Sequence, residues 1–288
     1  MRLLTFQAGG ATRVGVLRPD GEHVAEIGGA DSMLSLIDGG PDALAKAKRA
    51  LDGGSSSSHR LDGVRVLAPL PQPRGNVIAI GRNYQAHAEE TARAAGKSAD
   101  PPTVFTKAAT SITGPYDDIP VDSTVTSQVD WEVELGVVVG RPGLNIERAR
   151  AMDHVFGYVT VNDVSARDVQ FGWGGQYFKG KSLDGFCPFG PWIVTRDELG
   201  DPQALRLQLR VNGQTKQDAS TSDMIYPVDA ILEWVSRGMT LPSGTVIATG
   251  TPDGVGFART PPEFIKSGDV MEAEVEQIGV LRNRVVIS

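Results

Sequence analysis

The stretch VDWEVELGVVVG, residues 129–140, constrains the fold most, because it has the pattern of a β-strand and yet carries three carboxylates. Asp130, Glu132 and Glu134 occupy alternate positions, and the residues between them are apolar. Successive side chains of a strand point to opposite faces, so the acids would share one face. The run LGVVVG favours a largely buried strand. The sequence therefore predicts one continuous strand with a packed face and an acidic face.

Carboxylates that share one face of a buried strand repel one another and lose hydration, so an ionised cluster needs a compensating cation. A site made of carboxylate oxygens, without His or Cys, suits Mg²⁺ or Mn²⁺, and Ca²⁺ is the alternative for a wider cavity. An edge strand whose acidic face is solvated would need no such cation. The pattern alone leaves both interpretations open.

A further carboxylate follows a second predicted strand in YVTVNDVSARDVQ, residues 158–170. The strand is expected to end at Asn162 and Asp163, and a helical turn to follow it. Asp163, Arg167 and Gln170 are spaced i, i+4 and i+7, so they could share one face of that turn. In the alternative interpretation, Asp163 only caps the helix and Arg167 forms a surface ion pair.

The segment GRNYQAHAEE, residues 81–90, places Tyr84, His87 and Glu90 at three-residue steps. On a helix, His87 and Glu90 would meet on one face. A carboxylate beside an imidazole raises its basicity and fixes its tautomer, which a water-activating base requires. An isolated His–Glu pair is more often a solvated salt pair, so its interpretation as a catalytic dyad depends on the neighbouring motifs.

The segment GQYFKGKS, residues 175–182, matches the Walker A pattern of nucleotide-binding proteins. A phosphate loop must be followed by a helix that begins at the Lys-Ser pair, but LDGFCPFGPW follows here, with too many glycines and prolines for a helix. We therefore interpret Lys181 as a cation that neutralises an anionic substrate or a developing enolate. An exposed lysine is the alternative, and Lys179 competes for the role.

Composition narrows the class of protein. The 288 residues include 28 basic and 35 acidic residues, for a net charge of −7 with no block of like charge, so neither nucleic acid nor an anionic membrane is an expected partner. The single cysteine, Cys187, excludes an internal disulfide and fits a reducing compartment. No signal peptide or membrane span is predicted. We expect a cytoplasmic protein that acts on a small molecule.

The chain is expected to divide near residue 68. Residues 2–27 resemble three short strands, and DGGSSSSHRLDG, residues 52–63, is the expected flexible link. We therefore predict a small β-rich N-terminal domain, residues 1–68, and a main domain, residues 69–288. In the main domain, short apolar runs follow one another, and helices are expected only near 83–95, 165–171 and 228–237. This pattern favours an α+β, mainly β, antiparallel sandwich or roll.

Taken together, GRNYQAHAEE, DWEVELGVVVG, VNDVSARDVQ, KGKSLDGFCPFGPW and IATGTPDGVG resemble the fumarylacetoacetate hydrolase family in order and separation. The resemblance covers about residues 70–286. It implies a mixed β-sandwich roll, a small variable N-terminal domain and a homodimer.

The resemblance also implies roles for individual residues, carried over from matching motif positions. The implied metal ligands, for Mg²⁺ or Mn²⁺, are Glu132, Glu134 and Asp163. The implied catalytic residues are His87, Glu90 and Lys181. The implied substrate-binding residues are Arg167, Gln170 and Thr251, with Arg82 and Tyr84 beside the dyad as weaker candidates. Asp130 has no role implied by the resemblance.

The activity implied is metal-dependent hydrolysis of a C–C bond in a 2,4-dioxo acid, which releases pyruvate and a carboxylic acid. The substrate would be an acylpyruvate or a 2,4-dioxo-3-deoxy sugar acid. An oxaloacetate decarboxylase and a 2-hydroxy-dienoate isomerase pass through similar enolate chemistry and are the alternatives. Outside this class, the alternatives are a nucleotide-binding protein and a non-catalytic metal-binding module, but metal storage requires neither a dyad nor a lysine.

Overall fold

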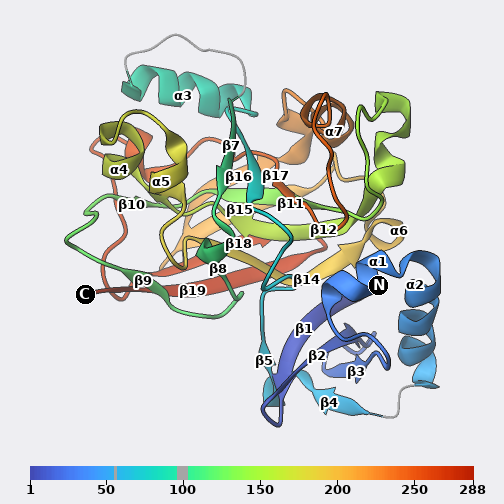
Figure 1. Cartoon of the computed structure of the whole chain (residues 1–288). Coiled ribbons are helices and arrows are strands. Elements are labelled where there is room, and N and C mark those ends of the chain that lie inside the picture. The colour runs from blue at the N-terminus through green and yellow to red at the C-terminus, as the bar shows by residue number, and fades with distance from the viewer. Residues whose placement is uncertain (55–56, 96–102) are drawn as a thin grey trace.

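The computed structural model describes residues 1–54, 57–95 and 103–288, and its largest element is a twelve-stranded sheet (Figure 1). Ten strands lie side by side in this sheet, and two short strands pair with members of the row. In spatial order the row is β4 (Ser58–Arg60), β3 (His23–Glu26), β2 (Ala11–Leu17), β1 (Arg2–Ala8), β14 (Cys187–Thr195), β12 (Val155–Asn162), β11 (Val133–Val139), β17 (Val246–Ala248), β6 (Val77–Gly81) and β7 (Thr103–Lys107). The two short strands are β5 (Arg65–Val66), beside β1, and β8 (Ile112–Thr113), beside β14.

Two further sheets complete the β-structure. The five-stranded sheet consists of β16 (Gln214–Ser220), β15 (Arg206–Val211), β18 (Val270–Val275), β19 (Gly279–Ile287) and β9 (Ile119–Val121). The two-stranded sheet pairs β10 (Val129–Asp130) with β13 (Ser165–Ala166). Most pairings are antiparallel, and the parallel ones join β8 to β14, β6 to β17 and β9 to β19.

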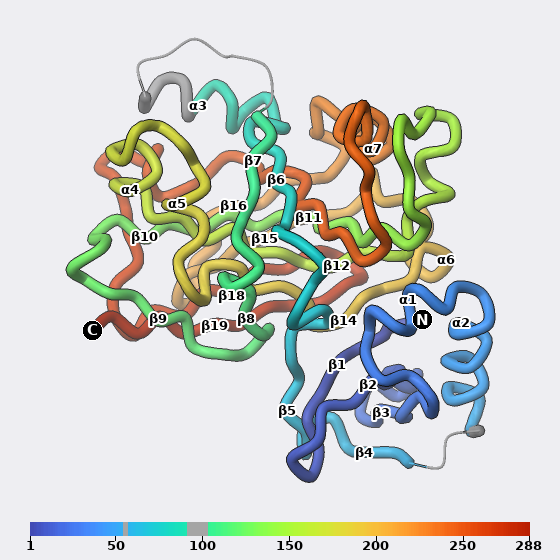
Figure 2. Tube along the Cα trace, viewed as in Figure 1, coloured from blue at the N-terminus to red at the C-terminus, as the bar shows by residue number. Residues whose placement is uncertain are grey.

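Helices are short and connect or cover the sheets (Figure 2). The α-helices are α1 (Met33–Asp38), α2 (Gly40–Arg49), α3 (Gln85–Ala95), α4 (Arg167–Gly172), α5 (Tyr177–Lys181), α6 (Arg196–Leu199) and α7 (Val228–Val235). Single turns of 3₁₀ or π type are η1 (Ala50–Gly54), η2 (Leu61–Gly63), η3 (Ala109–Ser111), η4 (Arg148–His154), η5 (Thr221–Asp223) and η6 (Gly256–Ala258). None of the helices in the described part of the chain is both long and apolar enough to cross a bilayer.

The core lies on both faces of the central strands β11 and β12. On one face, Leu135 and Tyr158 pack with Leu209 and Met271 of the five-stranded sheet. On the other face, Val138 and Val159 belong to a second core that includes Met33 of α1. Strands buried on both faces read as continuous apolar runs, which is why LGVVVG and VFGYVTVN are so hydrophobic. The predicted mainly β, α+β fold is confirmed.

The prediction of a single strand over residues 129–140 is wrong in one respect. The strand is interrupted at Trp131 and Glu132, which separate β10 from β11. β10 pairs with β13, whereas β11 pairs with β12 and β17, so the chain passes from one sheet to another at the break. The amide N–H groups at the break still have partners: that of Glu132 donates to Asn162 Oδ1 over 3.0 Å. The acids therefore do not alternate along one regular strand.

The N-terminal segment continues the large sheet. Leu3 of β1 pairs with Ile193 of β14, so the row of strands runs without a gap from residues 1–68 into the rest of the chain. Residues 58–60 lie in the expected flexible link but form β4, which pairs with β3. The division at residue 68 stays a prediction.

Gly157, in the middle of β12, has no room for a side chain. A Cβ atom there would lie 2.4 Å from the carbonyl oxygen of Val194 and 2.7 Å from Ile193 Cγ2. Overpacking of this kind costs about 1–3 kcal/mol, so we expect Gly157→Ala to lower the free energy of unfolding by that amount in urea titrations. Gly75→Ala, where a Cβ meets nothing within 4 Å, is the control and should change it by less than about 0.5 kcal/mol. Equal effects at the two sites would contradict the packing argument.

Candidate active site

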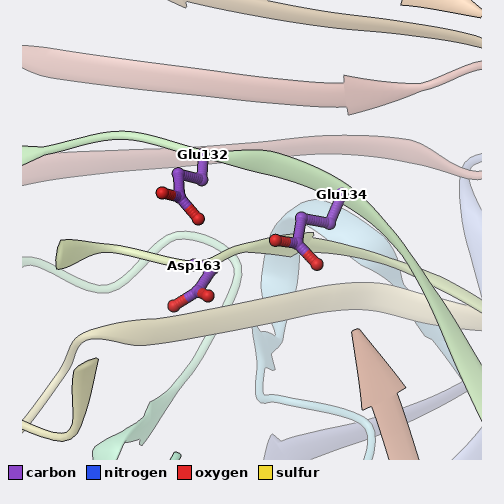
Figure 3. A group of neighbouring side chains, drawn as sticks. All are labelled: Glu132, Glu134 and Asp163. Atoms are coloured by element: carbon purple, nitrogen blue, oxygen red, sulfur yellow. The ribbon is translucent and has the colours of Figure 1, made fainter. Parts of the chain in front are cut away.

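Three acidic side chains meet where β11 begins and β12 ends (Figure 3). Glu132 immediately precedes β11, Glu134 lies within it, and Asp163 immediately follows β12. One carboxylate oxygen from each lies within 4.8 Å of the others, and all three residues are buried. The antiparallel pairing holds the two chain ends together, since Asp163 N–H donates to the Glu132 carbonyl oxygen over 2.8 Å. The solvated-edge interpretation of the acidic stretch is therefore wrong.

Side-chain cations already surround this acidic triad. Lys181 Nζ lies 2.7 Å from Glu132 Oε2 and 3.0 Å from Asp163 Oδ2. Lys107 Nζ donates to Asp163 Oδ1 over 2.5 Å, and Arg167 Nη2 lies 2.7 Å from Glu132 Oε1. Buried charges are tolerated only when they are paired and hydrogen-bonded, and these contacts provide the pairing. Part of the compensating charge predicted from the sequence thus comes from the protein itself.

The charges of the triad are unequal. Burial alone would raise the pKa of Glu132, but the positive charges of Lys181 and Arg167 outweigh it and lower this pKa to about 2. In the described part of the chain, Glu134 forms no ion pair, and it accepts a hydrogen bond from the Gly250 N–H over 2.7 Å. Burial, followed by repulsion from Asp163 and Glu132, raises the pKa of Glu134 well above its ordinary value. A bound cation would therefore stabilise the ionised form of Glu134 more than that of the other two acids.

The donor set fits a divalent cation. Four buried carboxylates, Asp130, Glu132, Glu134 and Asp163, face three buried side-chain cations, Lys107, Arg167 and Lys181, which leaves an excess of one negative charge when all are ionised. The triad offers only oxygen atoms, the ligands that Mg²⁺ and Mn²⁺ prefer. Each carboxylate oxygen has two lone pairs, so an oxygen bonded to a lysine can still bind a cation.

The predicted dyad is formed at the start of α3. Glu90 accepts a hydrogen bond from Nδ1 of His87 over 3.2 Å, which leaves Nε2 as the basic nitrogen. Glu90 also accepts the Gly254 N–H, at 3.0 and 3.2 Å from its two oxygens. Both side chains are largely buried, so the alternative of a solvated salt pair is wrong.

Arg167 and Gln170 lie in contact, as predicted, but Asp163 does not share their helix. The helix α4 begins at Arg167, and Asp163 is separated from it by β13, so the predicted i, i+4, i+7 face does not exist. Asp163 is not the N-cap either, because that position is Ala166. Arg167 Nη1 donates to Gln170 Oε1 over 2.9 Å, and both residues are buried. Tertiary contacts, and not helical spacing, bring Asp163 to the same place.

His87 of the dyad, with Glu132 and Glu134 of the triad, lines a small cavity of about 30 Å³, enough for roughly two water molecules. Its polar wall is formed by the predicted site residues Arg82, His87, Glu132, Glu134, Arg167, Gln170, Lys181 and Thr251. Thr251 is tied to the scaffold, since its Oγ1 donates to the Val133 carbonyl oxygen over 2.9 Å. Tyr84 is buried but does not line the cavity, and its hydroxyl has no hydrogen-bond partner in the described structure. Its predicted contact with substrate stays a prediction.

In the Walker-like segment, the helix lies before the Lys-Ser pair, whereas in a phosphate loop it lies after that pair. The short helix α5 ends at Lys181, where the helix of a phosphate loop would begin. Lys181 is buried against the triad and Lys179 is exposed, which favours Lys181 over Lys179, and the catalytic role of Lys181 stays a prediction.

Sequence reasoning missed Lys107, Gln217 and Asn83. Lys107 ends β7 and is fully buried against Asp163. Gln217 Oε1 accepts the Val133 N–H, and Asn83 bonds to the backbone of Tyr226 and Thr249, which anchors the chain just before α3.

Comparison with known proteins identifies the family. The family model described as "Fumarylacetoacetate (FAA) hydrolase C-terminal" matches residues 76–286. The chain belongs to the fumarylacetoacetate hydrolase family, as its motifs predicted.

Named relatives share most of the chain. Oxaloacetate tautomerase YisK of Bacillus subtilis (strain 168) is 45% identical over 242 residues, which cover 83% of this chain and 79% of the relative. Oxaloacetate tautomerase fahd2, mitochondrial, of Xenopus laevis is 40% identical over 294 residues, which cover 99% and 90%. The structure of a fumarylacetoacetate hydrolase from psychrophilic Exiguobacterium antarcticum superposes with a TM-score of 0.85 at 42% identity, over the whole of both chains.

These findings support an enzyme of this family with a buried acidic triad able to hold a divalent metal. The hydrolase reaction, the identity of the metal, the homodimer and the individual residue roles stay predictions. The cytoplasmic location stays a prediction too, since a relative carries the word mitochondrial in its name.

Metal binding at the triad should release a proton. Burial and the neighbouring carboxylates raise the pKa of Glu134 in the metal-free protein, and a cation favours its ionised form. We therefore expect Mn²⁺ affinity to weaken as pH falls, and titration calorimetry to show proton release when buffers of different ionisation enthalpy are compared. His87→Gln should leave the release unchanged, which excludes His87 as its source. Mn²⁺ binding that is independent of pH between 6 and 8 would contradict this assignment.

Proposed function

We propose that the protein is a metal-dependent enol–keto tautomerase of a compact 2-oxo acid, with oxaloacetate as the first candidate substrate. The observation that carries the proposal is one small cavity at the acidic triad, lined by two of its carboxylates together with His87 and Lys181. Phe171, Tyr177 and Phe257 line the cavity, and their bulk favours a short substrate over a long dienoate or a sugar acid. The relatives named oxaloacetate tautomerases support the same choice.

The charges of the cavity wall support a dianionic substrate. Arg82, Arg167 and Lys181 all line the cavity, and oxaloacetate carries two carboxylates. Glu132, Glu134 and Asp163 would hold Mg²⁺ or Mn²⁺. The cation would supply a Lewis acid that draws electron density from the 2-oxo and carboxylate oxygens of the substrate.

Tautomerisation moves a proton between C3 and the oxygen on C2, and no bond between heavy atoms breaks. His87 lines the cavity, and Glu90 holds its Nδ1, so its Nε2 can remove or return the proton at C3. Lys181 also lines the cavity, where its ammonium can stabilise the negative charge that develops on the C2 oxygen. Gly254 N–H fixes Glu90 and thereby the imidazole.

Hydrolysis of a C–C bond, the activity predicted from the sequence, is the second candidate. The His87–Glu90 geometry favours it, because the same imidazole could activate a water that attacks the C4 carbonyl of a 2,4-dioxo acid. The similar structure from Exiguobacterium antarcticum is titled a fumarylacetoacetate hydrolase. Decarboxylation of oxaloacetate needs no attacking water and is the third outcome to test.

The enol absorbance of oxaloacetate separates these reactions. Metal-stripped protein should accelerate loss of the enol band only after Mg²⁺ or Mn²⁺ is added, with no pyruvate formed. Pyruvate from oxaloacetate would indicate a decarboxylase. Pyruvate from an acylpyruvate alone would indicate the C–C hydrolase and overturn the tautomerase.

His87→Gln should lower kcat for tautomerisation by about 10²–10⁴-fold, because it removes the acid–base group, while Mn²⁺ affinity stays within about threefold. His154→Gln is the matched control, since His154 lies at the opposite end of β12 and bonds to the Arg141 carbonyl oxygen. Full activity in His87→Gln would remove this residue from the mechanism.

Aromatic side chains narrow the cavity and should limit substrate size. Phe171, Tyr177 and Phe257 line it, with the Phe171 ring centroid 5.1 Å from that of Phe257. We expect Phe171→Ala to raise kcat/KM for a seven-carbon 2-hydroxy-dienoate relative to oxaloacetate by about tenfold. Trp173→Ala is the control, because Trp173 is exposed on the same turn and does not line the cavity. An unchanged preference in Phe171→Ala would argue against a steric limit.

A further inference from the structure

Asp130 is the acid of the opening motif that has no assigned role. It lies in β10, is fully buried and does not line the cavity. Its Oδ1 accepts the N–H groups of Trp131, over 2.8 Å, and Gly256, over 2.7 Å. Its Oδ2 accepts the Phe257 N–H over 3.0 Å and Arg167 Nε over 2.8 Å. One carboxylate thus joins β10, α4 and the loop of residues 254–257.

The contact with Arg167 connects Asp130 to the acidic triad. Arg167 is held by Asp130 through Nε and Nη2, and the same Nη2 lies 2.7 Å from Glu132 Oε1. The Arg167 guanidinium also lies 5.8 Å from the centroid of the Phe257 ring, on the cavity wall. Asp130 therefore fixes the position of the cation that pairs with a predicted metal ligand.

The contact with loop 254–257 connects Asp130 to the dyad. Within four residues, this loop donates one N–H to Glu90, from Gly254, and two to Asp130, from Gly256 and Phe257. Gly256 packs against the Asp130 side chain so closely that a Cβ atom there would lie 2.8 Å from Oδ1. The loop is thus held between two carboxylates, one of which orients His87.

We propose that Asp130 is a positioning residue that couples the His87–Glu90 dyad to the acidic triad, through loop 254–257 on one side and Arg167 on the other. A role confined to stability would not require this choice of partners. Apart from the neighbouring Trp131, every donor to Asp130 belongs to a segment that lines the cavity or holds Glu90. The activity readout below rests on the proposed function, and the spectroscopic readout does not.

Asp130→Asn tests the proposal with little change in shape. The amide can accept hydrogen bonds through one oxygen only, so its NH₂ group must face either Arg167 or the loop amides as a second donor. We expect kcat for oxaloacetate tautomerisation to fall about 10–100-fold, with KM within about threefold, as is typical when the partner of a functional side chain is removed. Asp168→Asn is the matched control, because Asp168 neighbours Arg167 on α4 but bonds to Thr126 and Ser127, away from the cavity. It should leave both constants unchanged.

A second measurement needs no substrate. The chain has four histidines, so ¹⁵N-histidine spectra are simple, and His87→Gln identifies the His87 signal. In the wild type, Glu90 holds the Nδ1–H tautomer, and loosening loop 254–257 in Asp130→Asn should increase the Nε2–H population. Asp168→Asn should give the wild-type spectrum.

Both readouts must change for the proposal to stand. A kcat within twofold of wild type, even with a lower Tm, would make Asp130 a stabilising residue only. Lower activity with an unchanged His87 signal would overturn the coupling through the loop. A wild type without tautomerase activity would overturn the proposed function, and the His87 spectrum would then decide the positioning role alone. If Asp130→Asn does not fold, Asp130→Glu keeps the charge, displaces the carboxylate by one methylene, and is judged by the same two criteria.

Discussion

The pairing of buried carboxylates with buried cations is the interaction on which the rest of this structure depends. Isolated ions of either sign could not remain charged between two β-sheets, so each must be placed with its partners already in position. Lys107 and Lys181 reach Asp163 from different segments, and Lys181 and Arg167 do the same for Glu132. The sandwich supplies the rigidity that keeps these distances short, because β11 and β12 are packed on both faces.

This arrangement also explains how one site can serve related reactions. In the proposed function, Lys181 and a cation held by the triad would stabilise negative charge on a substrate oxygen, which tautomerisation, decarboxylation and C–C cleavage share. The reactions differ in what happens at carbon, and there the structure provides His87, oriented by Glu90, and an aromatic wall that limits length. In the proposed function, the polar residues of the cavity carry the chemistry, and its aromatic residues limit the length of the substrate.

The sequence predicted those parts of the site that have a local signal. The alternation of Glu132 and Glu134, the end of a strand before Asp163, and the three-residue step between His87 and Glu90 each follow from a backbone period. Lys107 and loop 254–257 had no such signal, because they act through contacts across 56 residues, to Asp163, and 164 residues, to Glu90. The strand break at Trp131 and Glu132 was missed for the same reason, since the exchange of partner strands is a tertiary event. Spacing predicts which side chains could meet, but tertiary packing decides which ones do.

Because the large sheet is continuous, residues 1–68 supply the strands that lie beside the edge of β14. β1 pairs with the outer edge of β14. On its other side, β14 pairs with β12, the strand that immediately precedes Asp163. An uncovered edge presents free N–H and C=O groups that pair readily with other chains. The N-terminal segment therefore covers the edge of β14 at Ile193 and Val194, where β1 pairs with it.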